Sequence, residues 1–535
     1  MRRRLTCLLA ITGMFALAVP TFATDFYVKA GAKRGKGTLE KPHKGIYKAL
    51  ADAVAGDVIH VAQGVYSGKL KAGFIVINTR DLTLLGGYND DFSERNPFKY
   101  KTIFRHDPES KASYNTKEII QCTDDHSNLV FDGFLLDGST RNKYNADGDL
   151  KFSESPNAPL ITVSSPGCKI RNCVVVNSAH NGIRMNARGE GNVIENNIII
   201  NYLDRGIDLG AAQEGSEVLV KNNTCAFGWT SLTVEGYGVQ IGRFGAITLE
   251  TNLIMYQSKY GMNNGLKNTG CFAYENCFFQ NGGGHYYFWD EDTNASLCID
   301  DPEDFEDANF EEAEDNFEAD PGVKPNKDFF EKYSNQIQSE GGGKIVMDDV
   351  NALRQMLGLD LLGTAGSGRK NFAPIYPFED TGLFATTEDC EGIGALADAK
   401  FEILKSAGPA EAKEYEEVQW QTLFDEYEAY DGKSVAVVGG NGGQDQSAYY
   451  VEGVEKKDYI CMKFRKPGGS TSDKFFVYVP YGSAAEKFYK SSKNKAFPFG
   501  DITQPIKVSG TAKAFKAPAL KINIAIIADE IALAK

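Results

Sequence analysis

Short apolar runs recur through the middle of the chain at nearly constant spacing. Their first residues lie 24, 26, 29 and 25 positions apart. An earlier copy, 132–137 (DGFLLD), fits once an insertion containing the polar residues 138–157 is allowed. A repeat of about 25 residues is typical of a stacked solenoid. The aligned segments are 172–177 (NCVVVN), 196–201 (NNIIIN), 222–227 (NNTCAF), 251–256 (TNLIMY) and 276–281 (NCFFQN).

A second short strand follows most copies after about ten residues, and it begins with a glycine. These glycines are Gly182, Gly206, Gly238 and Gly261. Two to three short strands per repeat, joined by turns and without helical periodicity, predict an all-β fold, a right-handed parallel β-helix.

The second position of the repeat is occupied mainly by glycine, asparagine and cysteine. Glycine and asparagine tolerate a left-handed backbone conformation. We expect Asn197, Asn223 and Asn252 to stack as a ladder of side-chain amides inside a tight bend. The alternative is that they lie in unrelated loops. In register, the second position reads Gly133, Cys173, Asn197, Asn223, Asn252 and Cys277.

The amino-terminal segment has the pattern of an export signal. Three arginines at 2–4 precede an apolar run at 5–19 and a small-residue cleavage site near Ala23, which predicts a signal peptide over residues 1–23. The run is too short to span a membrane, and nothing later in the chain reaches about 18 apolar residues. We therefore predict a protein without a transmembrane segment that is secreted, periplasmic or on the cell surface.

A short amphipathic helix is predicted just after this segment. Residues 45–54 carry apolar side chains at helical spacing, and such a helix would cover the open end of a solenoid. Residues 26–29, 35–50 and 55–66 together resemble the opening of right-handed parallel β-helix proteins of the pectin-lyase-like superfamily. The resemblance extends from about residue 26 to 396 and implies an exposed sheet that binds glycans.

The second strand of the repeat places polar side chains in one row. Because alternate strand residues face opposite sides, Arg184, Asp208, Gln240 and Asn263 should face solvent, while their neighbours face the core. An extended polysaccharide could lie along this row. Residues predicted to add substrate contacts beside it are His180, Asp204, Arg243 and Lys267, with Arg205 and Lys259 nearby.

Arg184 and Asp208 form the predicted catalytic pair. In a lyase an Arg or Lys would remove the proton beside a sugar carboxylate, and in a hydrolase paired carboxylates would act as acid and base. The alternative is that the row is an ordinary polar surface whose charges pair for modest stabilisation. The catalytic motifs of polygalacturonases, pectate lyases and alginate epimerases are missing, so a non-catalytic glycan-binding or cell-surface protein remains the second hypothesis.

An acidic stretch and isolated histidines are weaker candidates for ion binding. Residues 300–320 contain twelve Asp or Glu and no Lys or Arg. Such density could hold Ca²⁺, although a solvated acidic excursion fits the spacing better. No other cofactor is predicted. Residues 124–126 are read as a turn, and His285 has no second histidine at a spacing suited to zinc.

The last part of the chain is predicted to be a separate barrel. Its final strands at 508–515 and beyond resemble the closing strands of an OB-fold. The predicted organisation is a β-helix over 24–396, a linker over 397–415 and an OB-like barrel over 416–535. The five strand-like runs are 434–438, 459–464, 475–479, 506–509 and 522–527.

Charge is distributed unevenly between these parts. Residues 456–535 hold fifteen Lys or Arg against six Asp or Glu, whereas the whole chain has a net charge of -15. The overall charge makes nucleic acid an unfavourable main partner. The basic barrel could instead grip an anionic polymer, or its lysines could be plain solvated surface. Nine cysteines follow residue 23, so at least one stays unpaired, and we expect a monomer.

Overall fold

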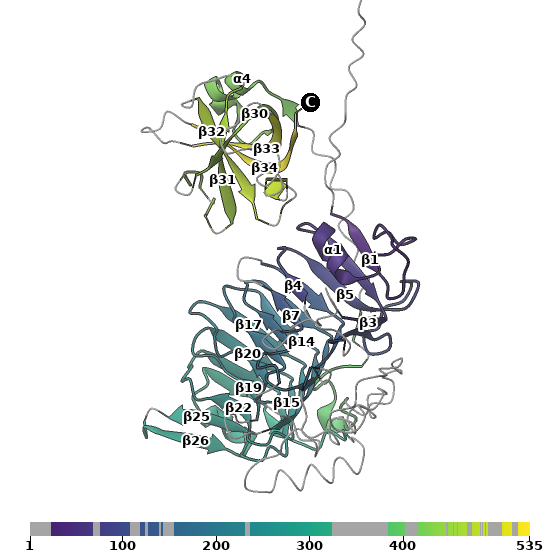
Figure 1. The fold of residues 1–535 in the computed structure, drawn as a ribbon. Helices are drawn as coiled ribbons and strands as arrows, with labels where there is room; N and C mark the ends of the chain where they lie inside the picture. The colour runs from purple at the N-terminus through teal and green to yellow at the C-terminus, as the bar shows by residue number, and fades with distance from the viewer. Residues whose placement is uncertain are drawn as a thin grey trace, which may run out of the picture. The chain divides into compact units, whose positions relative to one another are not determined.

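The computed structural model divides the chain into two compact units, which are described separately (Figure 1). The predicted signal peptide before Ala23, the turn at 124–126 and most of the predicted linker lie outside the described residues. These are 23–67, 75–107, 118–122, 127–138, 141–142, 155–229, 236–290, 292–323, 384–397, 399–401, 415–445, 448–452, 454–456, 458–467, 473–481, 483, 485–486, 488–489, 505–515 and 523–534.

The first unit is a parallel β-helix with three sheets, which confirms the predicted fold class. Every neighbouring pair of strands in the three sheets is parallel except β25 and β26. Sheet A contains β1 (Asp25–Val28), β2 (Val58–Ala62), β5 (Thr83–Tyr88), β8 (Val130–Asp132), β11 (Lys169–Arg171), β14 (Asn192–Glu195), β17 (Glu217–Lys221), β20 (Ala246–Glu250), β23 (Cys271–Tyr274) and β27 (Glu312–Glu314).

The other two sheets follow sheet A along each turn of the chain. Sheet B contains β3 (Gly64–Tyr66), β6 (Thr102–Phe104), β9 (Leu135–Asp137), β12 (Val174–Ser178), β15 (Ile198–Leu203), β18 (Thr224–Trp229), β21 (Leu253–Met255), β24 (Cys277–Phe279) and β28 (Phe317–Glu318). Sheet C contains β4 (Ile75–Ile77), β7 (Ile120–Cys122), β10 (Ile161–Val163), β13 (Ile183–Met185), β16 (Arg205–Asp208), β19 (Tyr237–Gln240), β22 (Tyr260–Asn264), β25 (Tyr286–Asp290) and β26 (Ala295–Ile299).

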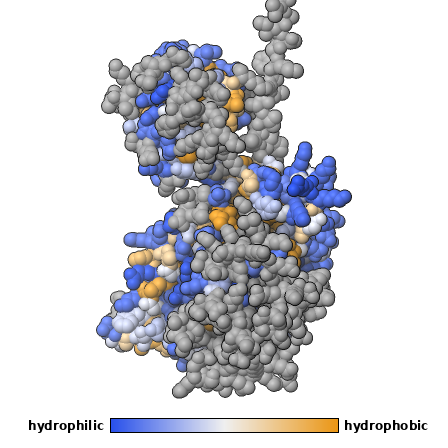
Figure 2. Space-filling model, viewed as in Figure 1, coloured by the Kyte–Doolittle hydropathy of each residue, from blue (hydrophilic) through white to orange (hydrophobic). Residues whose placement is uncertain are grey.

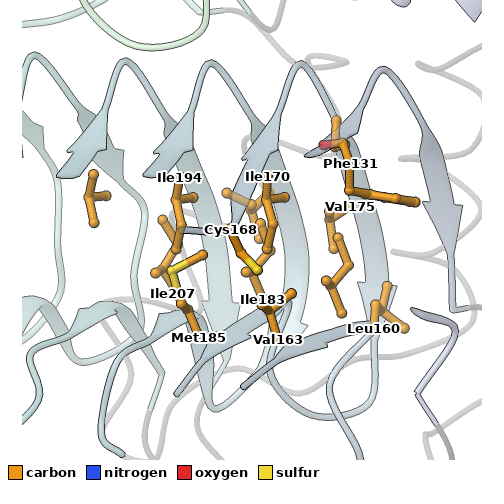
Figure 3. Close-up of a cluster of buried hydrophobic side chains, with 14 of the residues drawn as sticks. Phe131, Leu160, Val163, Cys168, Ile170, Val175, Ile183, Met185, Ile194 and Ile207 are labelled. Atoms are coloured by element: carbon orange, nitrogen blue, oxygen red, sulfur yellow. The ribbon is translucent and has the colours of Figure 1, made fainter. Parts of the chain in front are cut away.

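Stacked aliphatic side chains fill the interior of the β-helix. Ile170 and Ile194 from sheet A face Ile183 and Ile207 from sheet C, and all four are fully buried (Figure 3). Because each rung places an apolar residue above its equivalent in the rung below, the core is continuous along the stack. The predicted inward positions of the second strand are therefore confirmed.

Sheet B is apolar on its outer face as well. Val174, Ile198 and Leu253 point away from the interior, yet each is at most 2% exposed. They are covered by a segment that we call the strap, residues 384–397, which includes η4 (Glu388–Cys390). A sheet covered on both faces explains why its strands read as continuous apolar runs rather than as alternating patterns.

The asparagine ladder is confirmed and is longer than predicted. Nδ2 of Asn197 donates to Oδ1 of Asn223 at 2.9 Å, and the series continues through Asn252, Asn276 and Asn316 at 3.0, 2.9 and 2.9 Å. Each Oδ1 also accepts a backbone N–H from the preceding rung. The ladder lies at the bend between sheets A and B, where every amide is buried and bonded.

The left-handed residue at this bend precedes the ladder instead of belonging to it. Asn172, Asn196 and Asn222 have φ of 54°, 54° and 50°. The predicted alignment of the first and last copies of the repeat is wrong by one residue. In the first copy, Gly133 and not Asp132 lies in register with Asn172. In the last copy, Asn276 and not Cys277 continues the ladder. The sequence could not define the register of these two copies, because the strands of sheet B are apolar on both faces.

The glycines at the start of the sheet C strands allow close approach between rungs. A Cβ on Gly182 would lie 2.7 Å from the carbonyl oxygen of Gly206, and one on Gly206 would lie 2.7 Å from that of Gly238. The same contact recurs from Gly238 to Gly261 at 2.6 Å. No side chain fits at this corner, which explains the recurring glycine in the sequence.

Both ends of the β-helix core are closed by short helical segments. At the amino-terminal end, α1 (Ile46–Asp52) buries Ile46 and Ala49, as predicted, and hydrophilic side chains dominate the described surface around it (Figure 2). At the other end, η3 (Pro302–Asp307) lies inside the acidic stretch. Its Phe305 is fully buried against the core, so this stretch is a cap with exposed carboxylates and not a purely solvated excursion.

The second unit is a small closed barrel, as predicted. Strand β33 pairs with both β30 and β34, and β34 pairs in parallel with β32, so the five long strands close on themselves. Its elements are β29 (Glu416–Glu417), α4 (Trp420–Asp425), η5 (Tyr427–Tyr430), β30 (Ser434–Gln444), β31 (Tyr459–Arg465), β32 (Lys474–Pro480), β33 (Ile506–Ala514) and β34 (Ile524–Leu533).

Replacing one ladder amide should destabilise the β-helix strongly. Asn223→Ala removes a donor and an acceptor shared with Asn197 and Asn252 and leaves buried polar groups unpaired, so we expect a loss of about 2–4 kcal/mol, measured by urea unfolding. The control Gln213→Ala removes an exposed amide and should change stability by less than about 0.5 kcal/mol. Equal effects would contradict a structural ladder.

Candidate functional site

The predicted polar row lies in register on the outer face of sheet C. Arg184 pairs with Asp208, Asp208 with Gln240, and Gln240 with Asn263 on successive rungs. Each of these rungs carries an inward apolar neighbour from the same strand. The regular stack therefore brings four side chains from distant parts of the sequence into one line.

Asp208 is the centre of a charged cluster on this row. Its Oδ2 accepts hydrogen bonds from Nε of Arg184 at 2.8 Å, from Nδ2 of Asn181 at 2.7 Å and from Nη1 of Arg205 at 3.3 Å. Its Oδ1 accepts the backbone N–H of Gly210 at 2.9 Å. The carboxylate is thus buried, but fully supplied with donors.

His180 and Asp204 complete the cluster at the corner between sheets B and C. Nε2 of His180 lies 3.9 Å from Oδ2 of Asp204, and Oδ1 of Asp204 lies 3.4 Å from Nε of Arg205. Asp204 has a φ of 87°, which is a strained value for a residue with a side chain. We name these five residues, His180, Arg184, Asp204, Arg205 and Asp208, the arginine–aspartate cluster.

The charge states within the cluster follow from burial and from the two arginines. Burial alone would raise the pKa of Asp208, but the charges of Arg205 and Arg184 outweigh it and lower the pKa. Burial, helped by the charge of Arg184, lowers the pKa of His180 to about 4. At neutral pH the cluster therefore holds an ionised Asp208 and a neutral His180, so the contact between His180 and Asp204 is not an ion pair.

A second cluster in the β-helix has almost the same parts and serves as a comparison. Asp132, on sheet A, accepts from Arg95, from Nε of Arg171 at 2.8 Å and from Nδ2 of Asn172 at 2.8 Å. There, Arg95 is only 1% exposed and also donates to the backbone. In the arginine–aspartate cluster both arginines reach the surface, with 32% of the Arg184 and 29% of the Arg205 side chain exposed.

The remaining predicted site residues do not join the cluster. Gln240 donates to the backbone carbonyls of Ile241 and Asn263, and Asn263 accepts from the backbone of Gly265, so both amides support the ends of their strands. Arg243 is exposed in the turn after β19. Lys267 follows β22, two rungs beyond Asp208 on β16, and its Nζ lies 4.3 Å from the centre of the Trp289 ring.

Sequence reasoning missed three features of this face. Arg205 was noted only as a neighbour, although it is the second arginine on Asp208, and Asn181 was not considered. A signal existed, because Arg205 and Asp208 lie on one short strand beside the rung of Arg184. Three tyrosines, Tyr237, Tyr260 and Tyr287, were also missed, since their stacking depends on the register of separate rungs.

These tyrosines stack on one another with centroid separations of 5.8 and 4.6 Å and interplanar angles of 13° in both pairs. The faces of the central ring are covered by its neighbours, Tyr237 is buried, and the hydroxyl of Tyr287 donates to Oγ of Ser296 at 2.8 Å. The stack therefore supports the sheet and leaves little free aromatic face for a sugar ring.

Metal-binding groups do not converge in the described parts of the chain. Within those residues no three His, Cys, Asp or Glu side chains lie close enough to hold a metal ion, which includes the described carboxylates between 300 and 320. Nothing in their arrangement therefore supports the Ca²⁺ considered from the sequence. The residues described also contain no helix with the length and apolarity needed to cross a membrane.

Several lysines of the barrel already have acidic or amide partners. Nζ of Lys463 lies 3.1 Å from Asp445, and Nζ of Lys507 lies 2.6 Å from Glu417. Lys466 donates to Gln421 at 2.7 Å. The two carboxylate contacts reduce the positive charge that the described part of the barrel offers to a polymer, whereas the amide contact of Lys466 does not. Binding of an anionic polymer by the barrel stays a prediction.

Comparison with known proteins identifies no family. No family model and no curated protein matches the sequence. Similar solved structures are XylC in complex with xylose (12% identity, TM-score 0.35, 49% of this chain and 63% of that chain), pectate lyase Pel9A (13%, 0.32, 50% and 75%) and a rhamnogalacturonan lyase (16%, 0.32, 48% and 73%). The chain thus spans less than two thirds of XylC.

These similarities concern the fold alone. The parallel pairing of three stacked sheets in this chain itself establishes the β-helix that the resemblance to pectin-lyase-like proteins predicted. Activity, substrate and partners are matters for proposal.

Acid should destabilise the β-helix through His180. The folded protein keeps this side chain neutral down to a pKa of about 4, whereas in the unfolded chain it takes up a proton near pH 6.5, so protonation favours unfolding between these values. Above about pH 6.5, His180 should leave the free energy of unfolding unaffected by pH. At pH 4.5, protonation of His180 in the unfolded chain should lower that free energy by about 2–3 kcal/mol.

This loss is measured by urea unfolding of wild type and His180→Asn at pH 7 and pH 4.5. Asp208, whose lowered pKa also favours the folded state at higher pH, is present in both proteins and cancels in the comparison. The variant should lose less stability than wild type on acidification. An identical pH dependence would show that folding leaves the pKa of His180 unchanged and would contradict the prediction.

Proposed function

We propose that this chain is a secreted carbohydrate-active β-helix protein that binds an acidic polysaccharide on sheet C, at the arginine–aspartate cluster. The observation that carries the proposal is the pair of arginines, Arg184 and Arg205, which are about one third exposed above a buried Asp208. Acidic sugars carry carboxylates, and arginine binds carboxylates with good geometry.

The way in which the arginines contact Asp208 supports ligand binding. Arg184 contacts Asp208 through Nε, and no bond to its terminal nitrogens is found among the described residues, so its outer edge can meet a carboxylate. The two acids of the cluster, Asp204 and Asp208, are at most 6% exposed. Although the cluster is close to neutral in total, it therefore presents positive charge to solvent.

Elimination suits this arrangement better than hydrolysis. A hydrolase needs one carboxyl group with a raised pKa to protonate the leaving oxygen. Asp208 has a lowered pKa and is saturated with donors, so it is a poor acid. In an elimination, by contrast, one arginine would neutralise the sugar carboxylate and so make the neighbouring proton easier to remove. The other arginine, in its uncharged form, would accept that proton as the bond to the leaving sugar breaks, and water would protonate the oxygen that leaves. Asp208 would then position Arg184 and Arg205.

The second hypothesis, a non-catalytic glycan-binding protein, uses the same surface. Nδ1 of His180 has no hydrogen-bond partner among the described residues, but it is buried, so it is not presented to a polymer as a base. Binding and turnover are therefore separate questions.

The arginines can be tested against a closely matched control. Arg184→Ala should weaken binding of polygalacturonate or alginate at least about tenfold, because a charged hydrogen bond to the ligand is lost. Arg171→Ala removes an arginine of similar exposure that makes the same 2.8 Å Nε contact to an aspartate, but on sheet A. Arg171→Ala should therefore lose about as much stability as Arg184→Ala but bind the polysaccharide as wild type does.

Binding and turnover are measured together. Affinity comes from calorimetry, elimination from absorbance of unsaturated products at about 235 nm, and hydrolysis from new reducing ends in the absence of that absorbance. Elimination abolished by Arg184→Ala supports a lyase, whereas binding without products supports the second hypothesis. Loss of binding in Arg171→Ala but not in Arg184→Ala would move the site away from sheet C.

A further inference from the structure

Two buried cysteines meet where the strap crosses the last rungs of the β-helix. Sγ of Cys277, on β24, lies 3.6 Å from Sγ of Cys390, at the end of η4. They are 0% and 1% exposed, and 113 positions separate them in the sequence. Both thiols are free in the structure. A disulfide needs the two sulfurs about 2.05 Å apart, so only a small shift would join them.

The strap is otherwise held by apolar packing and a few hydrogen bonds. The carbonyl of Gly392 accepts from Asn222, and the N–H of Gly394 donates to the carbonyl of Thr251. The N–H of Ala395 donates to Oγ1 of Thr224 at 2.9 Å. These contacts keep Cys390 over the outer face of sheet B, where Cys277 is the cysteine opposite.

We propose that Cys277 and Cys390 are a cross-link site, at which a disulfide fastens the strap to the β-helix under oxidising conditions. The oxidant is a small disulfide such as oxidised glutathione. One protein thiolate attacks it and releases one glutathione, and the second protein thiolate attacks the mixed disulfide and releases another. Two protein thiols are oxidised, one glutathione disulfide is reduced, and the two thiol protons pass to the released glutathiones.

The cross-link would act on the unfolded chain more than on the folded one. It closes a long loop and so removes conformations available after unfolding. Burial and the neighbouring thiol raise the pKa of Cys277, so oxidation of the folded protein should be slow near pH 7 and faster near pH 8.5. Oxidation during refolding, before the strap covers the sheet, should be faster still.

The full chain is tested after reduction and exchange into a buffer of oxidised and reduced glutathione, both folded and during refolding. Alkylation followed by peptide mapping should recover a Cys277–Cys390 peptide, and the unreduced chain should migrate faster on a denaturing gel. The midpoint of thermal unfolding should rise by about 3–6 °C, and dithiothreitol should reverse the rise.

Two variants separate this site from the other cysteines. Cys390→Ala should lose both the linked peptide and the response to reductant, while Cys298→Ala, which removes the exposed thiol, should keep both. Comparison of oxidised with reduced wild type needs no variant and remains decisive if Cys390→Ala fails to fold. Recovery of Cys277 and Cys390 only as separate alkylated or glutathionylated peptides would overturn the proposal.

Discussion

The bend between sheets A and B is the constraint on which the β-helix depends. Each of the five rungs from Asn196 to Asn316 turns there through a left-handed residue and then places an amide in the interior, as at Asn196 and Asn197. A buried amide without partners costs about 1–3 kcal/mol, and its partners come from the adjacent rungs. One rung therefore cannot be stable alone. The ladder also holds successive rungs in register, and this register is what aligns Arg184 with Asp208 on sheet C.

The same combination of aspartate, arginines and asparagine occurs twice, and its surroundings decide what it can do. At Asp132, one arginine is enclosed and bonded to the backbone, so the group cross-links the structure. At Asp208, the acid is buried while both arginines remain accessible. Because the buried acid is bonded to arginines that are about one third exposed, positive charge remains at the surface of an acidic protein. Exposure, and not residue type, separates the structural cluster from the candidate site.

Local pattern was sufficient to predict most of the fold but not the details of the site. The repeat, the helix at 46–52 and the five barrel strands could be read from spacing because each depends on neighbours in sequence or on an equivalent position one rung away. The register of the strands at Gly133 and Asn276 could not be predicted from spacing, because strands covered on both faces lack the alternation of apolar and polar residues that distinguishes inside from outside. Arg184 and Asp208 were found through that alternation. The bonding of Gln240 and Asn263 to backbone groups, and the partnership of Arg205 with Asp208, depend on side-chain conformations that spacing does not define.

The strap gives this solenoid an order of folding. Most contacts in the stack join adjacent rungs, so the rungs can assemble one after another. The hydrogen bonds of the strap instead join residues 170, 171 and 200 positions apart. It can dock only after the rungs from Asn196 to Cys277 have formed its platform, and until then the aliphatic outer face of sheet B stays open to water and to other chains. Docking of residues 384–397 is therefore a late step, and the interval before it is when an unfinished β-helix is most prone to aggregate.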